Sequence, residues 1–72
     1  MDFDLKRAAK NIKVLRIQRN WKFRYIEKNT EIEEERLRKF ELAKLIPTYE
    51  ELYRLSRLYE VTIDELVFKE LE

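Results

Sequence analysis

Residues 48–66 read TYEELYRLSRLYEVTIDEL, and this stretch decides the fold. Thr48 precedes Glu51 by three residues, and Thr62 precedes Glu65 in the same way. Each pair is a capping box, in which the threonine oxygen and the glutamate accept hydrogen bonds from free backbone N–H groups of a first helical turn. The stretch therefore predicts two consecutive helices. Their apolar faces are Leu52, Leu55, Ser56 and Tyr59 in the first helix, and Ile63, Leu66, Val67 and Leu71 in the second.

The chain before this stretch has the apolar periodicity of three further helices. They are expected over about 4–19, 23–29 and 33–42, and Pro47 interrupts the chain after them. Asn20 ends the first, because asparagine tolerates the left-handed conformation at a helix stop. No strand pattern competes, so residues 1–72 predict one all-α domain of five short helices. The inward positions are Leu5, Ala8, Ile12 and Leu15, then Ile26, then Leu37, Phe40 and Glu41.

The composition excludes most chemistry. The 72 residues include no cysteine, no histidine and no glycine. The common zinc ligand sets, the usual nucleophile and base arrangements and phosphate-cradling loops are therefore missing. We expect a protein that is not an enzyme, needs no cofactor and takes no small-molecule substrate. Because no apolar run approaches the ~20 residues of a membrane span and no signal peptide is evident, we expect a cytoplasmic protein without membrane contact.

Charge is divided unevenly along the chain. Residues 1–30 contain nine Lys and Arg against three Asp and Glu, a net +6, and residues 31–72 contain seven against twelve, a net −5. The change of sign falls at residues 30–40, TEIEEERLRKF, where four carboxylates come directly before three cations. Such an asymmetry suggests a binding surface.

From Ile12 to Leu66 the sequence resembles, without gaps, the helix-turn-helix family of phage repressors, Cro and XRE-type regulators. The matching features are IKVLR at 12–16, Ile26, Ile32, Leu37, Glu41, Pro47-Thr48 and the closing segment 52–66. The resemblance implies a compact five-helix, lambda-repressor-like domain in which Arg16 pairs with Glu41. It also implies that the second helix lies across a DNA backbone and that the third enters the major groove.

The departures from the family pattern fall on the DNA-facing unit. Lys22 and Phe23 replace the cap and the phosphate-contacting glutamine, Glu27 replaces a small alanine, and Glu31 replaces the turn glycine. The exposed positions of the third helix correspond to Glu33, Glu34, Glu35, Arg38 and Lys39, of which Glu34, Glu35 and Arg38 would read bases. Carboxylates facing phosphates repel by ~1 kcal/mol per pair at 4 Å even in water. One glutamate could read cytosine, but three in a row oppose DNA binding.

Protein binding is the interpretation that these departures favour. An exposed Phe23 beside charges of both signs is typical of an interface hot spot. The sequence also resembles the small modulator-of-repression proteins of temperate lactococcal phages. That resemblance implies an antirepressor in a lysis–lysogeny switch of a bacterial host cell, which binds the N-terminal DNA-binding domain of a cognate phage repressor. The expected contact surface is Phe23, Glu31, Glu34, Glu35, Arg38, Lys39 and Leu42.

Other interpretations stay open. Glu34–Arg38 and Glu35–Lys39 are i,i+4 pairs that could neutralise the third helix. DNA could be bound directly, as by a Cro-like repressor, or jointly with the partner as a co-repressor; the residues for this are Lys22, Arg24, Lys28, Arg38 and Lys39. Phe23 would be core if the second helix were rotated.

Apolar residues away from the family pattern point to one more alternative. Trp21 falls on a core leucine position and is expected to be structural. Several residues are expected outside the shared core, which leaves self-association as a homodimer open. They are Val14, Ile17, Leu42, Leu45, Ile46, Tyr49, Tyr53, Val67, Phe68 and Leu71.

Overall fold

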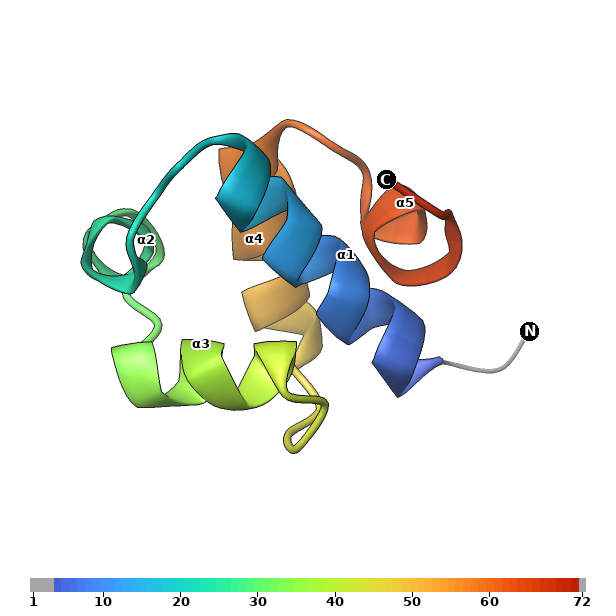
Figure 1. The fold of residues 1–72 in the computed structure, drawn as a ribbon, viewed down its shortest axis with the longest axis horizontal. Helices are drawn as coiled ribbons and strands as arrows, with labels where there is room; N and C mark the ends of the chain where they lie inside the picture. The colour runs from blue at the N-terminus through green and yellow to red at the C-terminus, as the bar shows by residue number, and fades with distance from the viewer. Residues whose placement is uncertain (1–3, 72) are drawn as a thin grey trace.

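The computed structural model describes residues 4–71, which form five α-helices around one core (Figure 1). The helices are α1 (Leu5–Gln18), α2 (Phe23–Thr30), α3 (Glu34–Glu41), α4 (Tyr49–Tyr59) and α5 (Ile63–Phe68). Residues 4–71 contain no strand, so the prediction of an all-α chain with five helices is confirmed. Within that range, no helix has both the length and the apolar character needed to cross a membrane.

Side-chain caps begin three of the helices. The Asp4 carboxylate accepts a hydrogen bond from the Arg7 N–H (3.1 Å) at the start of α1. Both predicted capping boxes form. At α4, the Glu51 N–H donates to Thr48 Oγ1 (3.1 Å) and the Thr48 N–H donates to Glu51 Oε1 (2.8 Å). The box at α5 has the same two bonds, at 3.0 and 2.9 Å. Each cap satisfies N–H groups that a helix start leaves without intrahelical partners.

Left-handed residues follow the first four helices, although the chain has no glycine to fill these positions. Asn20 (φ 56°), Glu31 (φ 62°), Ala43 (φ 59°) and Glu60 (φ 59°) adopt this conformation. The prediction for Asn20 is confirmed. Each non-glycine residue there costs about 1 kcal/mol, because its Cβ approaches the following carbonyl oxygen.

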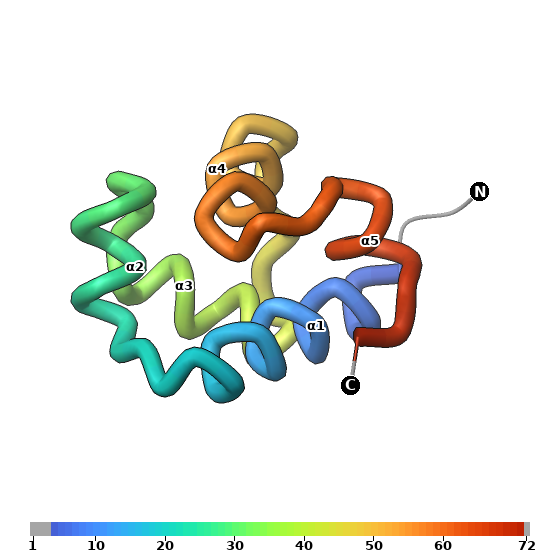
Figure 2. Tube along the Cα trace, turned by 90° about the horizontal axis from the view of Figure 1, so that it is seen from above, coloured from blue at the N-terminus to red at the C-terminus, as the bar shows by residue number. Residues whose placement is uncertain are grey.

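The core lies where α1, α3 and α4 meet, and α2 and α5 close its two ends (Figures 1 and 2). α1 packs on α3 and α5, α2 on α3 and α4, and α4 on α5. Phe40 and Tyr59 are wholly buried at its centre. The core cluster consists of Ile12, Leu15, Ile26, Ile32, Leu37, Phe40, Leu52, Leu55, Tyr59, Leu66 and Val67.

The end of α5 differs from the prediction. α5 ends at Phe68, so Leu71 lies beyond the helix, partly buried against the core. Asn11, buried in α1, closes α5: its Nδ2 donates to the carbonyls of Leu66 (2.8 Å) and Lys69 (2.6 Å), and its Oδ1 accepts from the Leu71 N–H (3.3 Å). These bonds satisfy groups that a longer helix would have paired internally.

Val67 was expected on the apolar face of this helix but outside the core that the family pattern shares. It is only 3% exposed and belongs to the core cluster, so the second expectation is wrong. Leu45 is likewise partly buried against the core. The remaining apolar residues of that expectation are exposed, apart from the half-buried Val14; they are Ile17, Leu42, Ile46, Tyr49, Tyr53 and Phe68.

Candidate functional site

Two bidentate ion pairs fix α3 in the molecule. Arg16 of α1 donates to Glu41 through Nε (2.7 Å to Oε2) and Nη2 (3.0 Å to Oε1). Arg36 of α3 donates to Glu51 of α4 in the same way, at 2.7 and 2.8 Å. The first pair was implied by the family resemblance, and the Glu41 side chain is only 7% exposed, as its inward prediction requires. Charge-assisted bidentate bonds of this kind hold a fixed geometry.

The pKa values of these groups reflect the bonds. The hydrogen bond to Glu41 raises the pKa of Arg16. The Arg36 guanidinium, assisted by the Thr48 N–H, lowers the pKa of the Glu51 carboxyl below its usual range. These bonds favour the charged forms of Arg16 and Glu51. α3 is tied to α1 at one end and to the capping box of α4 along its length.

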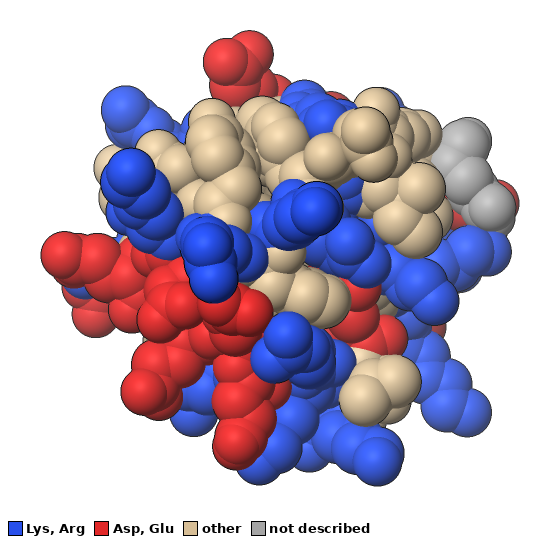
Figure 3. All heavy atoms as spheres, turned by 60° about the vertical axis from the view of Figure 1, so that its left-hand side comes forward, with Lys and Arg blue, Asp and Glu red and all other residues tan. Residues whose placement is uncertain are grey.

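The outward side of α3 presents a sequence of charge types. We call it the α3 face; it consists of Glu31, Glu34, Glu35, Arg38, Lys39 and Leu42. Carboxylates occupy the first turn, cations the last turn, and Leu42, which is 62% exposed, follows the helix. In Figure 3, which looks at the side formed by α2 and α3, acidic atoms gather at the lower left and basic atoms lie beside them. Of the seven predicted contact residues, four thus lie in α3, Leu42 caps its end, and Glu31 lies before it as the C-cap of α2.

The predicted i,i+4 pairs form at this face. Arg38 Nη2 lies 3.2 Å from Glu34 Oε1, and Lys39 Nζ lies 4.0 Å from Glu35 Oε2. Glu31 adds a contact of 3.5 Å with Arg54 of α4. All are partly or fully exposed pairs, whose contribution to stability is about 0–1 kcal/mol each. Such weak pairs exchange readily for partners on another molecule.

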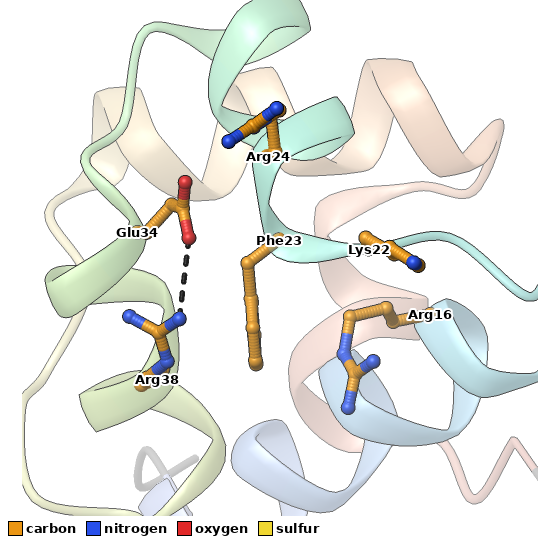
Figure 4. Close-up of a pocket in the computed structure, with 6 residues that line it drawn as sticks. All are labelled: Arg16, Lys22, Phe23, Arg24, Glu34 and Arg38. Carbon is orange, nitrogen blue, oxygen red and sulfur yellow. Dashed lines mark hydrogen bonds and ion pairs between the residues drawn. The ribbon is translucent and has the colours of Figure 1, made fainter.

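Phe23 lies in a cleft beside the α3 face, half-buried rather than exposed as expected (Figure 4). Its ring lies between two guanidinium groups: Arg16 Cζ is 4.4 Å and Arg38 Cζ is 5.1 Å from the ring centroid. Each cation–π contact stabilises by about 0.5–2 kcal/mol, according to exposure. The cleft has a volume of about 530 Å³ and is lined by Arg16, Lys22, Phe23, Arg24, Glu34 and Arg38.

Of the five cations of the DNA-binding alternative, Lys22, Arg24 and Arg38 line this cleft. Lys22, Arg24 and Lys28, at the start of α2 and along it, are exposed and have no ion pair within residues 4–71. Arg38 and Lys39, in contrast, are paired with the glutamates of α3. The structure therefore separates the five predicted cations into a free group on α2 and a paired group on α3.

Trp21 is half-buried in the connection between α1 and α2. Its indole stacks on Tyr59 at 5.5 Å between centroids and contacts Tyr25 at 4.7 Å. It also packs against the core cluster, as its expected structural role requires.

Several of the contacts that shape the site have no signal in the sequence. The Arg36–Glu51 pair spans fifteen residues, and the Phe23 stack joins α1, α2 and α3. One partial signal was available: Arg36 points away from the α3 face, because it falls two positions after Glu34 and two before Arg38.

Comparison of the chain with protein-family models, curated proteins and solved structures gave no match.

Proposed function

We propose that this protein is a transcriptional regulator of the phage-repressor helix-turn-helix type that acts by binding a cognate repressor. In this proposal it is an antirepressor: it covers the N-terminal DNA-binding domain of the repressor and excludes operator DNA. The observation that carries the proposal is the α3 face, with two glutamates in its first turn where the family pattern expects polar or basic readers.

The arrangement of α2 and α3 supports the fold in the proposal. The two helices are joined by the three residues 31–33 and lie crosswise to one another, and α1 and α4 pack behind them (Figures 1 and 2). This is the arrangement that the resemblance over residues 12–66 implies for a lambda-repressor-like domain. The Arg16–Glu41 pair falls at the positions that the same resemblance names.

Electrostatic complementarity supports the choice of partner. A DNA-binding domain presents a basic surface shaped for a polyanion. Glu35 offers that surface an exposed carboxylate and Glu34 a half-buried one, each held by a weak pair. Leu42, at the other end of the α3 face, and the edge of Phe23 in the adjoining cleft would supply the apolar anchors. Charged pairs then steer the encounter, and the apolar anchors supply most of the affinity.

The test is an anisotropy titration of the cognate repressor on labelled operator DNA, with and without this protein. We expect the wild type to release the DNA. The Glu34→Lys/Glu35→Lys variant should need at least about tenfold more protein, since two reversals at ~1 kcal/mol each exceed the 1.4 kcal/mol of a tenfold change. Glu60→Lys/Asp64→Lys is the matched control, because it reverses two exposed acids, one of them in the first turn of α5.

Two results would overturn the proposal. If the wild type and the Glu34→Lys/Glu35→Lys variant release the repressor at the same concentration, the α3 face is not part of the interface. Tight binding of the operator by this protein alone, with a steep salt dependence, would assign the site to DNA instead.

Direct or joint DNA binding is the second candidate, and the free cations Lys22, Arg24 and Lys28 favour it. A co-repressor would form a larger complex on the operator rather than release the repressor. The same titration separates the two outcomes, because anisotropy rises for a ternary complex and falls on release.

A further inference from the structure

A second groove lies on the outer side of the α1–α2 turn. It has a volume of about 400 Å³ and is lined by Asn20, Trp21, Lys22, Arg24, Tyr25 and Lys28; we call it the basic groove. Its volume lies within the range of about 300–1,000 Å³ of ligand-binding clefts. Lys22 and Arg24 line both this groove and the Phe23 cleft, so the two hollows are neighbours.

Aromatic side chains form the floor of the basic groove. Tyr25 is 43% exposed, and its ring lies tilted against the indole of Trp21. Trp21 is held from the other direction by stacking on the buried Tyr59 and by Arg19, whose Cζ lies 5.5 Å from the indole. The floor is therefore a fixed apolar surface that accepts a side chain. Figure 3 shows uncharged atoms along the upper edge of this side of the molecule, with basic atoms next to them.

Three cations surround this floor. Lys22, Arg24 and Lys28 are exposed, and none forms a hydrogen bond through its side chain or an ion pair within residues 4–71. Arg38 and Lys39 of α3, in contrast, are paired with Glu34 and Glu35 of the same helix. An apolar floor with a rim of unpaired cations is complementary to an anionic ligand that also has an apolar part.

We infer that the basic groove binds an acidic segment of a partner protein. In this segment an aliphatic or aromatic side chain fills the floor against Trp21 and Tyr25, and flanking carboxylates pair with the three cations. Duplex DNA fits less well, because its phosphates would pair with the rim and leave the aromatic floor uncovered. The inference goes beyond the proposed function: it concerns other residues, and it requires a ligand opposite in charge to the basic surface that the α3 face would meet.

The experiment selects ligands for the intact protein from a displayed library of random twelve-residue peptides. We expect the selected peptides to combine several Asp or Glu residues with an aliphatic or aromatic residue. Binding of a selected peptide, made without tryptophan, is then followed by the emission of Trp21, the only tryptophan of the chain. The Lys22→Glu/Lys28→Glu variant should bind that peptide at least about tenfold more weakly, at roughly 1 kcal/mol for each reversal.

Lys13→Glu/Lys44→Glu is the matched control, because it reverses two exposed lysines outside the basic groove. It should bind the selected peptide as the wild type does, and circular dichroism checks that both variants keep their helices. Selection of peptides without acidic residues would overturn the inference, and so would equal binding by the groove and control variants. A 16-base-pair DNA duplex that changes the Trp21 emission and displaces the peptide at lower concentration would assign the groove to nucleic acid. None of these outcomes depends on a repressor, so the proposed function stands or falls separately.

Discussion

Tyr59 places a polar atom in the hydrophobic core cluster. The residue is wholly buried, and its hydroxyl makes no hydrogen bond to any residue from 4 to 71. Burial also raises the pKa of the phenol, because the anion would lose its hydration. A buried hydroxyl without a partner costs about 1–3 kcal/mol of desolvation.

Tyr59→Phe should therefore raise the free energy of unfolding by about 1 kcal/mol, since it removes the hydroxyl and keeps the ring that stacks on Trp21. Urea denaturation followed by circular dichroism measures the change. A loss of stability above 1 kcal/mol would contradict this prediction and would mean that the hydroxyl is satisfied in solution.

Glu31 ends α2 with φ 62°, a conformation that glycine adopts without steric cost. Glu31→Gly should stabilise the domain by about 0.5–1 kcal/mol, reduced slightly by loss of the exposed contact with Arg54. Lys28→Gly, inside α2, is the control and should destabilise by about 0.5–1 kcal/mol. Thermal unfolding measures the melting temperature of both variants. Equal shifts of that temperature in the same direction would contradict the claim that the left-handed backbone at Glu31 favours glycine.

At the scale of the elements, α5 is a helix of six residues that depends on a residue of another helix. Asn11 of α1 supplies bonds to the Leu66 and Lys69 carbonyls and to the Leu71 N–H. A helix of this length is not stable by itself in water. Its position on α1 therefore relies on these bonds and on the burial of Leu66 and Val67.

Asn11→Ala should lower the free energy of unfolding by about 1–3 kcal/mol, because buried carbonyls lose their donor. Hydrogen exchange measured residue by residue should show the largest loss of protection in residues 63–71. Equal loss in α3 and α5 would contradict this local effect.

The capping boxes make stability depend on pH. In the capping box of α4, hydrogen bonds from Arg36 and Thr48 lower the pKa of Glu51. In the capping box of α5, the hydrogen bond from the Thr62 backbone N–H lowers the pKa of Glu65. Groups with a depressed folded-state pKa contribute stability that is present above their ordinary value of 4.5 and is lost as pH falls through the folded-state value.

Stability should therefore decrease as the pH is lowered from about 5 toward 2, and Glu51→Gln should make that decrease shallower. The same variant lowers stability at pH 7, because it removes the carboxylate that pairs with Arg36. Urea denaturation at a series of pH values tests both effects. An unchanged acid slope in the variant would rule out Glu51 as a source of the pH dependence.

Local signals account for what could be predicted from the sequence. Thr48 and Thr62 cap their helices with partners three residues away, and Asn20 needs only its own backbone angles, so all three were predictable. The Phe23 environment was not, because Arg16 and Arg38 reach its ring from two other helices. Asn11 was missed for the same reason: its partners lie more than fifty residues away, and a buried polar residue does not stand out in an apolar periodicity.

The whole molecule brings together the basic and acidic parts of the sequence. α2 lies in the basic part and α3 in the acidic part, and these two helices pack on one another. Free cations and paired glutamates therefore share one side of the molecule (Figure 3). The net charge of +1 therefore conceals many charges of both signs, 16 basic and 15 acidic.

Glu34→Gln/Glu35→Gln would change the net charge from +1 to +3 and would release Arg38 and Lys39 from their pairs. We expect this variant to bind duplex DNA more tightly than the wild type, with a steeper dependence on salt, because more cations can then replace counterions. Anisotropy with a labelled duplex at two salt concentrations measures both quantities. Unchanged DNA affinity would mean that Glu34 and Glu35 do not weaken binding of duplex DNA.

The contact between α1 and α5 joins the first and the last helix of residues 4–71. During synthesis, residues near the beginning emerge seconds before those near the end, at about 5–20 residues per second. α2, α3 and α4 can pack with neighbours in sequence as they appear, but Asn11 has to wait for the carbonyls of Leu66 and Lys69. Completion of the domain therefore waits for the synthesis of residues 63–71, and a product that ends before them would lack the junction that closes the fold.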